Sequence, residues 1–296
     1  MVAVGLVAAA LTGCSSNPND DCVKPLPSGS AAKLVEATGK IGAKPKITAP
    51  TPIDATKSQR SVLTEGRGTT VHLGQQVELG FTVLDGKTGS VLGSGYGDQG
   101  AVVSVGSDVI SRGLMCTTVG SRVAIAVAAK DAQQSGGSAD SGTQIYVLDV
   151  VDTSLNAANG AVRPSVSGFP TVVLAPTGQP GITIPSSGKA PTKVRSEVLK
   201  QGDGAVVKKD STAVLQYTAV GWDSKQPVTT SWGNGGPDRV NMATGQSQIQ
   251  GQSSALPQSM LKELVGQKVG SQLVIETPEA GQVPAAAWVV DILGIR

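Results

Sequence analysis

The sequence predicts an α+β fold of two tandem units, each a curved antiparallel sheet wrapped on one short helix. Three observations lead to this prediction. The chain has 296 residues, a length that suits two domains better than one. It holds 38 Gly and 17 Pro but only 16% charged residues, as expected for short strands and many turns. Finally, its second half repeats its first half.

Alternating apolar residues mark the predicted strands. Residues 77–83 (VELGFTV) follow the period of two that a half-buried strand shows, and 122–127 and 144–151 are similar runs. Residues 257–264 are expected to form a helix with their apolar residues on one side. One short helix among several strands favours a unit in which the helix packs on a curved sheet.

Four ordered matches link the two halves, which makes duplication far more probable than chance. The matched segments are 60–68 with 195–204, 77–83 with 214–220, 119–123 with 269–273, and 146–150 with 288–292. We therefore expect one domain at 39–153 and another at 165–296, joined by a linker at 154–164.

The first residues predict export. Residues 2–11 are an apolar run of about signal-peptide length, too short for a stable membrane span, although no Lys or Arg precedes it. The run ends in Leu-Thr-Gly-Cys at 11–14, which resembles the bacterial lipobox. That resemblance implies a signal peptide at 1–13, a lipid on Cys14, a flexible tether at 14–38, and anchoring at the outer face of the bacterial cytoplasmic membrane. The alternative is a buried apolar strand with an incidental cysteine.

Two cysteines remain once Cys14 is lipidated. An even pair in an exported protein suggests a disulfide, here between Cys22 and Cys116. It would tie the N-terminal arm to the first domain and, in the chain-entropy model, stabilise the fold by roughly 4–5 kcal/mol at most. The alternative is two free buried thiols.

Charge and histidine content exclude several function classes. The formal net charge is +2 and there is no Lys/Arg run, so nucleic acid is not an expected partner. His72 is the single histidine, which argues against Ser-His-Asp or Cys-His catalysis and against His-rich metal sites. We expect neither a metal nor a cofactor.

Several local sequences carry a family resemblance. They are Gly202-Asp203-Gly204, the strand at 214–218, the Val-Gly-Ser turns at 119–121 and 269–271, and the closing strand at 288–294. In this order they resemble the FKBP-type peptidyl-prolyl isomerases, here as tandem domains of a bacterial (actinobacterial-like) lipoprotein. The resemblance covers roughly residues 45–151 and 165–296, and each motif alone is weak.

The resemblance implies a pocket at the junction of sheet and helix that binds Xaa-Pro segments of exported proteins. Rotation about the prolyl amide faces a barrier of ~18–20 kcal/mol because amide resonance must be broken. A dry aromatic pocket favours the twisted, less polar amide, so catalysis needs no nucleophile.

Four aromatic residues fall on the implied pocket walls. They are Tyr217 and Trp288 in the second domain, and Phe81 and Tyr146 in the first. The chain has only eight aromatic residues (three Trp, three Tyr and two Phe), so four at these positions favour a shared apolar pocket. The alternative is that they are ordinary core aromatics.

Other implied pocket positions depart from the family pattern. A Phe-Asp pair, whose carboxylate hydrogen-bonds within the pocket, becomes Val228-Thr229 in the second domain and Val91-Leu92 in the first. Both substitutions remove the carboxylate, which makes both pockets degenerate.

The residues expected to hold and floor the peptide also differ between the domains. The family's Val-Ile pair, whose backbone holds the peptide, is kept as Val109-Ile110. In the second domain only Leu256 is plausible, and Pro257 after it has no N–H to donate. The Trp that floors the family's pocket becomes Met260, and in the first domain we expect a helix about one turn shorter, with no residue at the floor position.

These observations leave more than one function open. The first hypothesis is a peptidyl-prolyl isomerase (rotamase) of weak activity that assists the folding of exported proteins. The second is a non-catalytic peptide-binding or chaperone lipoprotein that keeps the fold, and the third is a purely structural envelope protein. Ligand binding is expected chiefly in residues 165–296.

Overall fold

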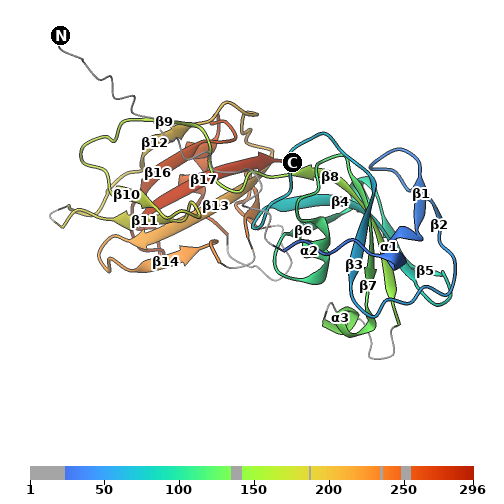
Figure 1. Ribbon diagram of the computed structural model, residues 1–296. Helices are drawn as coiled ribbons and strands as arrows, with labels where there is room; N and C mark the ends of the chain where they lie inside the picture. The colour runs from blue at the N-terminus through green and yellow to red at the C-terminus, as the bar shows by residue number, and fades with distance from the viewer. Residues whose placement is uncertain (1–23, 135–141, 187, 234–235, 248–254) are drawn as a thin grey trace, which may run out of the picture.

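The computed structural model describes residues 24–134, 142–186, 188–233, 236–247 and 255–296 (Figure 1). This part of the chain is rich in antiparallel sheet, and its α-helices are only four to seven residues long. Two large sheets hold most of the strands. We call each sheet, with the helix packed on its inner face, the first unit and the second unit.

The first unit has the strand order β3-β7-β8-β4-β5, and β6 also pairs with β4. Every pairing in it is antiparallel, and helix α2 packs against β7. Its elements are β3 (Gln59–Thr64), β4 (Gln76–Asp85), β5 (Val91–Gly95), β6 (Ala101–Ser104), α2 (Val109–Leu114), β7 (Arg122–Val127) and β8 (Gln144–Thr153).

The second unit repeats this arrangement. Its strand order is β12-β16-β17-β13-β14, β15 also pairs with β13, and α4 packs against β16. A short strand, β9 (Ala161–Val162), adds to the edge at β12. The other elements are β12 (Arg195–Gln201), β13 (Thr212–Gly221), β14 (Pro227–Thr230), β15 (Asp238–Asn241), α4 (Gln258–Leu264), β16 (Gln272–Thr277) and β17 (Ala286–Ile295).

The central strands are buried on both faces. Every residue of β7 and of β16 is buried, because the helix covers one face of each sheet and an irregular segment covers the other. Burial on both faces explains why the five residues after Arg122 are all apolar, so that 122–127 does not alternate as expected from the sequence.

The outer face of the first sheet is covered by the segment that precedes it. This segment holds α1 (Ser30–Lys33), β1 (Glu36–Thr38) and β2 (Lys46–Thr48), and α1 packs on β3 and β7. Ala31, Ala32 and Val35 are buried there. The predicted flexible tether at 14–38 is therefore wrong for residues 24–38, because their small apolar side chains cover the sheet.

The outer face of the second sheet is covered in a different way. Residues 154–164, predicted as a linker, contribute buried Ala158 and the paired strand β9. A hairpin of β10 (Thr171–Leu174) and β11 (Pro180–Thr183) follows. The linker prediction fails because this stretch belongs to the cover of the sheet.

The first unit also departs from the expected single helix. Besides α2 and α1 it holds α3 (Ala129–Gln134) and a 3-10 turn, η1 (Gly97–Gln99). The second unit has α4 alone among its described residues.

The two units are in contact. Arg296 ion-pairs with Glu78 (Nε to Oε1, 2.7 Å) and with Asp152 (Nη1 to Oδ2, 2.7 Å). The backbone N–H of Leu155 donates to the carbonyl of Leu293 (2.9 Å). These bonds join β4, β8 and the segment after β8 in the first unit to β17 and the residue after it in the second.

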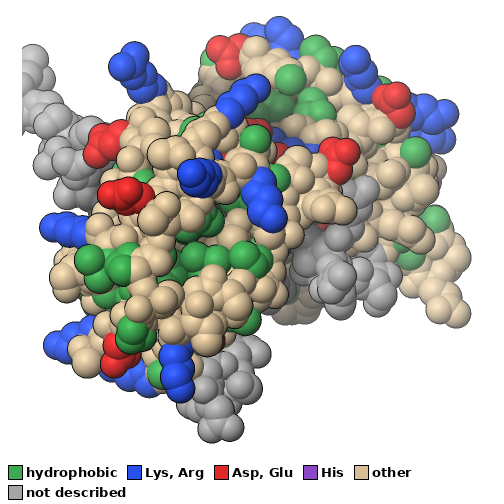
Figure 2. Space-filling view, turned by 90° about the vertical axis from the view of Figure 1, so that its right-hand side faces the viewer, with side chains coloured by type: hydrophobic (Ala, Val, Ile, Leu, Met, Phe, Trp, Pro, Cys, Tyr) green, Lys and Arg blue, Asp and Glu red, His purple; other side chains and the backbone are tan. Residues whose placement is uncertain are grey.

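The surface carries charges of both signs. On the face shown in Figure 2, Lys and Arg side chains lie among Asp, Glu and hydrophobic side chains. In the residues that the structure describes, no helix is both long and apolar enough to cross a membrane.

Candidate functional site

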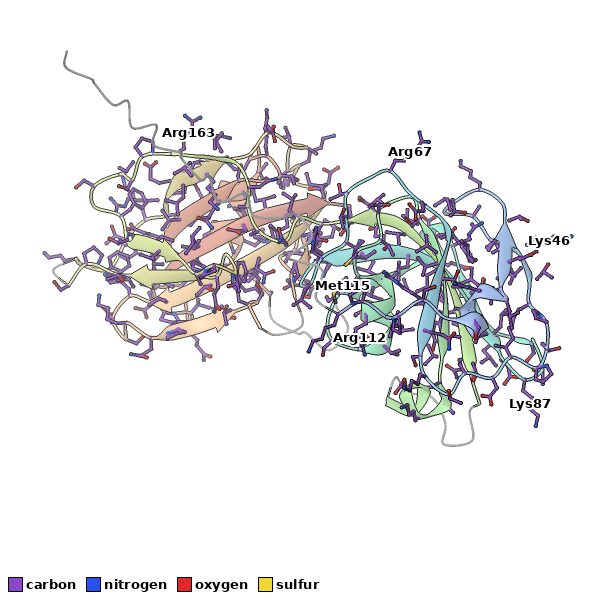
Figure 3. All side chains as sticks on the ribbon, in the orientation of Figure 1. Lys46, Arg67, Lys87, Arg112, Met115 and Arg163 are labelled. Atoms are coloured by element: carbon purple, nitrogen blue, oxygen red, sulfur yellow. The ribbon has the colours of Figure 1, made fainter. Side chains whose placement is uncertain are left out.

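An apolar hollow of about 430 Å³ opens in the first unit where the sheet meets α2. Strands β4, β6 and β8 form its sheet wall, and the start of α2 forms the other side; Figure 3 labels Arg112 within this helix and Met115 directly after it. The lining residues are Leu79, Phe81, Val83, Ala101, Val103, Ser104, Asp108, Ile110, Ser111, Tyr146 and Leu148.

Sheet pairing explains why these side chains converge. Phe81 on β4 lies opposite Leu148 on β8, and Val83 lies opposite Tyr146. Alternate residues of a strand face the same side, so Leu79, Phe81 and Val83 share one face. Phe81 and Tyr146 are half-buried, which leaves part of each ring accessible to a ligand.

The polar groups around the hollow are already bonded to one another. The Asp108 carboxylate caps α2 by accepting the N–H groups of Ile110 and Ser111, both at 3.0 Å, and also accepts the Ser111 hydroxyl. The Tyr146 hydroxyl donates to Gln144 (2.9 Å), and burial raises the pKa of Tyr146. The wall therefore offers apolar surface and few unused donors.

The equivalent place in the second unit is filled. Tyr217, Leu256 and Met260 are each at most 5% exposed, and they lie in the core with Trp288. The rings of Tyr217 and Trp288 are 6.2 Å apart between centroids, and the Trp288 indole N–H donates to Thr277 (3.1 Å). These residues contact one another and leave no accessible ring face comparable to that of Phe81.

Equivalent positions follow from the pairing of the strands. Leu79 lies opposite Ala101 in the first unit, and Leu215 lies opposite Asp238 in the second. Each helix also ends four residues before an isolated β-bridge residue. These residues are Thr118, which bridges to Thr70, after α2 and Lys268, which bridges to Val206, after α4. The matched pairs around the site are Phe81 with Tyr217, Ala101 with Asp238, Ile110 with Met260, Ser111 with Leu261, and Tyr146 with Trp288.

This matching corrects the prediction that the first unit lacks a floor. Helix α2 has six residues and α4 has seven, so the difference is one residue rather than one turn. Val109-Ile110, expected to hold the peptide by their backbone, form the first turn of α2, and Ile110 takes the floor position of Met260. The predicted docking donor, the Ile110 N–H, is engaged by Asp108.

The expected preference for the second unit is therefore not what the geometry supports. Met260 provides a floor there, but Tyr217, Leu261 and Trp288 occupy the space above it. The open hollow lies in the first unit, where smaller side chains stand at the matched positions.

Four predicted pocket residues lie on edge strands of the two sheets. Val91 and Leu92 on β5 and Val228 on β14 are each about half exposed. Thr229 lies on β14 opposite Ala219, so it too sits on an edge strand. Both strands pair with the sheet on one side only, so these residues lie at the edge of each sheet.

Sequence reasoning missed two acidic residues. Asp238 is buried and accepts hydrogen bonds from the hydroxyls of Tyr217 (3.2 Å) and Ser247 (2.5 Å). Burial and the Asp238 carboxylate raise the pKa of Tyr217. Asp108 was detectable in principle, because Asp immediately before an apolar helical run is a common N-cap.

The cysteine predictions fall largely outside the described residues. Cys14 and Cys22 both lie there. Cys116 is disulfide-bonded, and pairing with Cys22 stays a prediction that non-reducing peptide mapping would test. Cys116 has a left-handed φ of 64°, the conformation that Gly266 adopts after α4.

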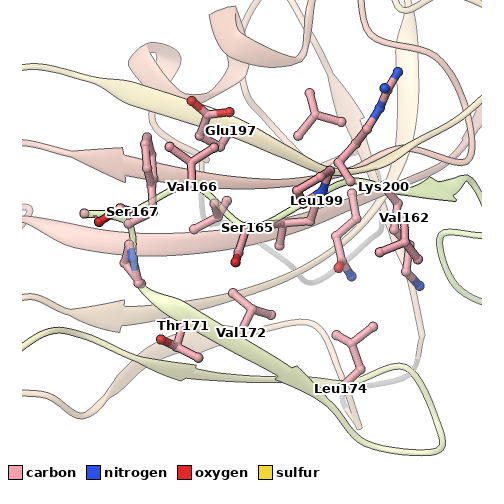
Figure 4. A pocket seen from close by; sticks show the side chains of 18 residues that line it. Val162, Ser165, Val166, Ser167, Thr171, Val172, Leu174, Glu197, Leu199 and Lys200 are labelled. Atoms are coloured by element: carbon pink, nitrogen blue, oxygen red, sulfur yellow. The ribbon is translucent and has the colours of Figure 1, made fainter.

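A larger groove of about 650 Å³ lies on the outer face of the second sheet (Figure 4). The segment from Val162 to Leu174 forms one wall, and β12 with β16 forms the other. Two of its polar side chains are engaged elsewhere: Lys200 donates to the carbonyl of Ala158 and Gln272 donates to Asp291. Nothing in its lining indicates a reaction or a ligand class.

Metal ligands do not gather in the described parts of the chain. No group of three or more His, Cys, Asp or Glu side chains is placed there to hold an ion.

Comparisons with known proteins give only distant likenesses. No protein-family model matches the chain, and no curated protein matches it. The chain is similar to the solved structure of the three FKBP domains of wheat FKBP73, with 12% identity and a TM-score of 0.32 over 81% of this chain and 94% of that one. It is also similar to a multi-domain immunophilin from Arabidopsis thaliana, with 16% identity and a TM-score of 0.29 over 45% of this chain and 48% of that one.

A third likeness is to a putative peptidyl prolyl cis-trans isomerase, FKBP12, from Mycobacterium tuberculosis. Identity is 19% and the TM-score 0.26, over 36% of this chain and 86% of that one. At such identities and TM-scores, these likenesses carry no argument about the activity of this chain.

Proposed function

We propose that this chain binds proline-containing segments of exported polypeptides in the hollow of the first unit, with weak isomerase turnover. The observation that carries the proposal is the open apolar hollow walled by Phe81, Ile110 and Tyr146. A proline ring buried there would gain the hydrophobic stabilisation of an apolar side chain, ~1.5–3 kcal/mol.

Turnover is proposed to be weak because the backbone donor is occupied. The family resemblance assigns the Val-Ile backbone to holding the peptide, but the Ile110 N–H already donates to Asp108 (3.0 Å). A peptide carbonyl would have to displace that carboxylate to be held. Binding by apolar contact is therefore better supported than fast isomerisation. Isomerase activity stays the second candidate function, because aromatic walls favour a twisted amide.

The test is to fill the hollow with the residue that the second unit uses. Ser111→Leu places at this position the side chain that Leu261 has in α4. We expect the affinity for a blocked, fluorescently labelled Xaa-Pro peptide to fall roughly ten- to hundredfold, since the burial of the ring is lost. Isomerisation of the same peptide is followed by NMR exchange.

Val228→Ala is the matched control, because Val228 is exposed and away from both sites. It should leave the affinity unchanged. An unaltered Kd in Ser111→Leu would exclude the hollow as the binding site, and full-length protein without affinity for any proline peptide would refute the function.

We further propose that the protein is held at the outer face of the bacterial cytoplasmic membrane by a lipid on Cys14. The lipobox-like residues 11–14 after an apolar run support this. Cys14→Ser should move the protein from the membrane fraction to the soluble fraction. Retention in salt-washed membranes would reject the anchor.

A further inference from the structure

The hollow of the first unit has one charged group in its lining, the carboxylate of Asp108. The other lining side chains are apolar, aromatic or hydroxyl-bearing. Asp108 is exposed, so its charge stands at the rim of the hollow and not beneath it. A ligand in the hollow therefore lies beside this carboxylate.

The carboxylate is oriented but not neutralised. Its Oδ1 accepts two backbone N–H groups at 3.0 Å, and its Oδ2 accepts the Ser111 hydroxyl. Across the described ranges no Lys or Arg forms an ion pair with it. A carboxylate has about four lone-pair sites, so three neutral donors leave room for a further donor.

The other hydrogen-bonding groups around the hollow also favour a ligand that donates a hydrogen bond. The donors of Ile110 and Ser111 are used by Asp108, and the Tyr146 hydroxyl is used by Gln144. What remains at the rim is acceptor capacity on Asp108. A ligand is therefore recognised by what it donates, and a cation is the strongest donor a peptide offers.

We infer that the hollow selects peptides in which a Lys or Arg flanks the buried proline, and that Asp108 is the residue that determines this specificity. The inference rests on the proposed function, because it requires a peptide in the hollow. The apolar walls take the ring, and the Asp108 carboxylate pairs with the neighbouring ammonium or guanidinium group. An acidic neighbour is disfavoured by like charge.

The experiment compares three blocked peptides that differ only in the residue before proline: Lys, Gln or Glu. Each is titrated into the full chain at low salt, with fluorescence anisotropy as the readout. We expect the Lys peptide to bind about two- to tenfold more tightly than the Gln peptide, and the Glu peptide to bind more weakly than both. The spread should shrink as the salt concentration rises, because exposed charges are screened.

Asp108→Asn is the decisive variant. Asn is as good an N-cap as Asp, so α2 is expected to remain capped while the charge is lost. The three peptides should then bind alike. Asp223→Asn, at an exposed position of the second unit, controls for a change in net charge and should keep the ranking.

The outcomes separate the inference from the proposed function. Equal affinities of the three peptides for the unaltered chain overturn the inference and leave the function standing. A ranking that survives in Asp108→Asn overturns the role of Asp108. Absence of binding by all three peptides overturns both.

Discussion

The two units share one strand order, but the site is open in the first unit and filled by side chains in the second. In the first unit Phe81, Ile110 and Tyr146 border an open hollow, whereas in the second Tyr217, Met260 and Trp288 are packed together. The matched residues of the second unit are larger at almost every position. Side-chain volume, and not topology, decides whether this fold presents a pocket, because cores are packed to near-crystalline density.

A second contrast lies on the outer faces of the same sheets. Arg122 and Asp149 are register partners in the first unit and form a buried ion pair (Nε to Oδ1, 2.6 Å). Their counterparts are Gln272 and Asp291, joined by one hydrogen bond (Nε2 to Oδ1, 2.6 Å).

Each pair fastens the segment that covers its sheet. Asp149 accepts the Gly42 N–H (2.8 Å) and Arg122 donates to the carbonyls of Gly39 and Lys40 (both 3.1 Å). Asp291 accepts the Ala158 N–H (2.9 Å) in the same way. The Arg122–Asp149 pair carries two charges and the Gln272–Asp291 pair carries one. Both nevertheless hold the covering segment to its sheet.

The largest expected effect comes from breaking the charged pair. Arg122→Ala would leave Asp149 buried without its cation and should lower the free energy of unfolding by about 3–5 kcal/mol. Urea denaturation followed by circular dichroism measures the loss. Gln272→Ala is the matched change and should cost about 1–3 kcal/mol, since it removes a neutral partner. Equal losses would show that the charge of Arg122 contributes nothing beyond its hydrogen bonds.

A somewhat smaller effect is expected from emptying the closed site. Met260 is fully buried, so Met260→Ala should lower the free energy of unfolding by about 2–5 kcal/mol and leave a cavity beside Tyr217 and Trp288. If side-chain volume alone makes the second site closed and the first open, this variant should also acquire measurable affinity for the proline peptide. Destabilisation without any binding would contradict the idea that side-chain volume at this position keeps the second site closed.

These contrasts explain how far the sequence could be interpreted alone. The sheet-rich character was predictable, because alternating or continuous apolar runs such as 77–83 and 122–127 give strands in most contexts. The packed segment at 24–38 was not, since its few small apolar residues carry no periodicity and are ordered only by the sheet beneath them. Propensity has little weight where tertiary contacts supply the stabilisation.

The site was harder to predict than the fold. The aromatic positions Phe81 and Tyr146 were found, but their exposure depends on neighbours such as Ala101 and Ser111 that are far away in the sequence. The choice between an open and a filled pocket rests on the sum of several volumes. A family resemblance compares one residue position at a time, so it does not reveal the combined volume of the side chains around the site.

The smallest expected effect concerns the singly charged pair and pH. Burial raises the pKa of Asp291, against the opposing effects of the Ala158 N–H, the Gln272 amide and the Lys200 charge. In the folded state Asp291 therefore binds its proton more tightly than in the unfolded chain. Between the ordinary and the raised pKa, the folded state holds more protons, so the free energy of unfolding decreases as pH rises.

The contribution of Asp291 is thus fully present below its ordinary pKa and is lost as pH rises through the raised value. Asp291→Asn removes this titration while keeping one acceptor for its two donors. Wild type and variant are unfolded in urea at a series of pH values from acid to neutral. Their difference in unfolding free energy should move against the wild type as pH increases. A difference that moves the other way would mean that Gln272, Ala158 and Lys200 stabilise the Asp291 carboxylate more than burial penalises it.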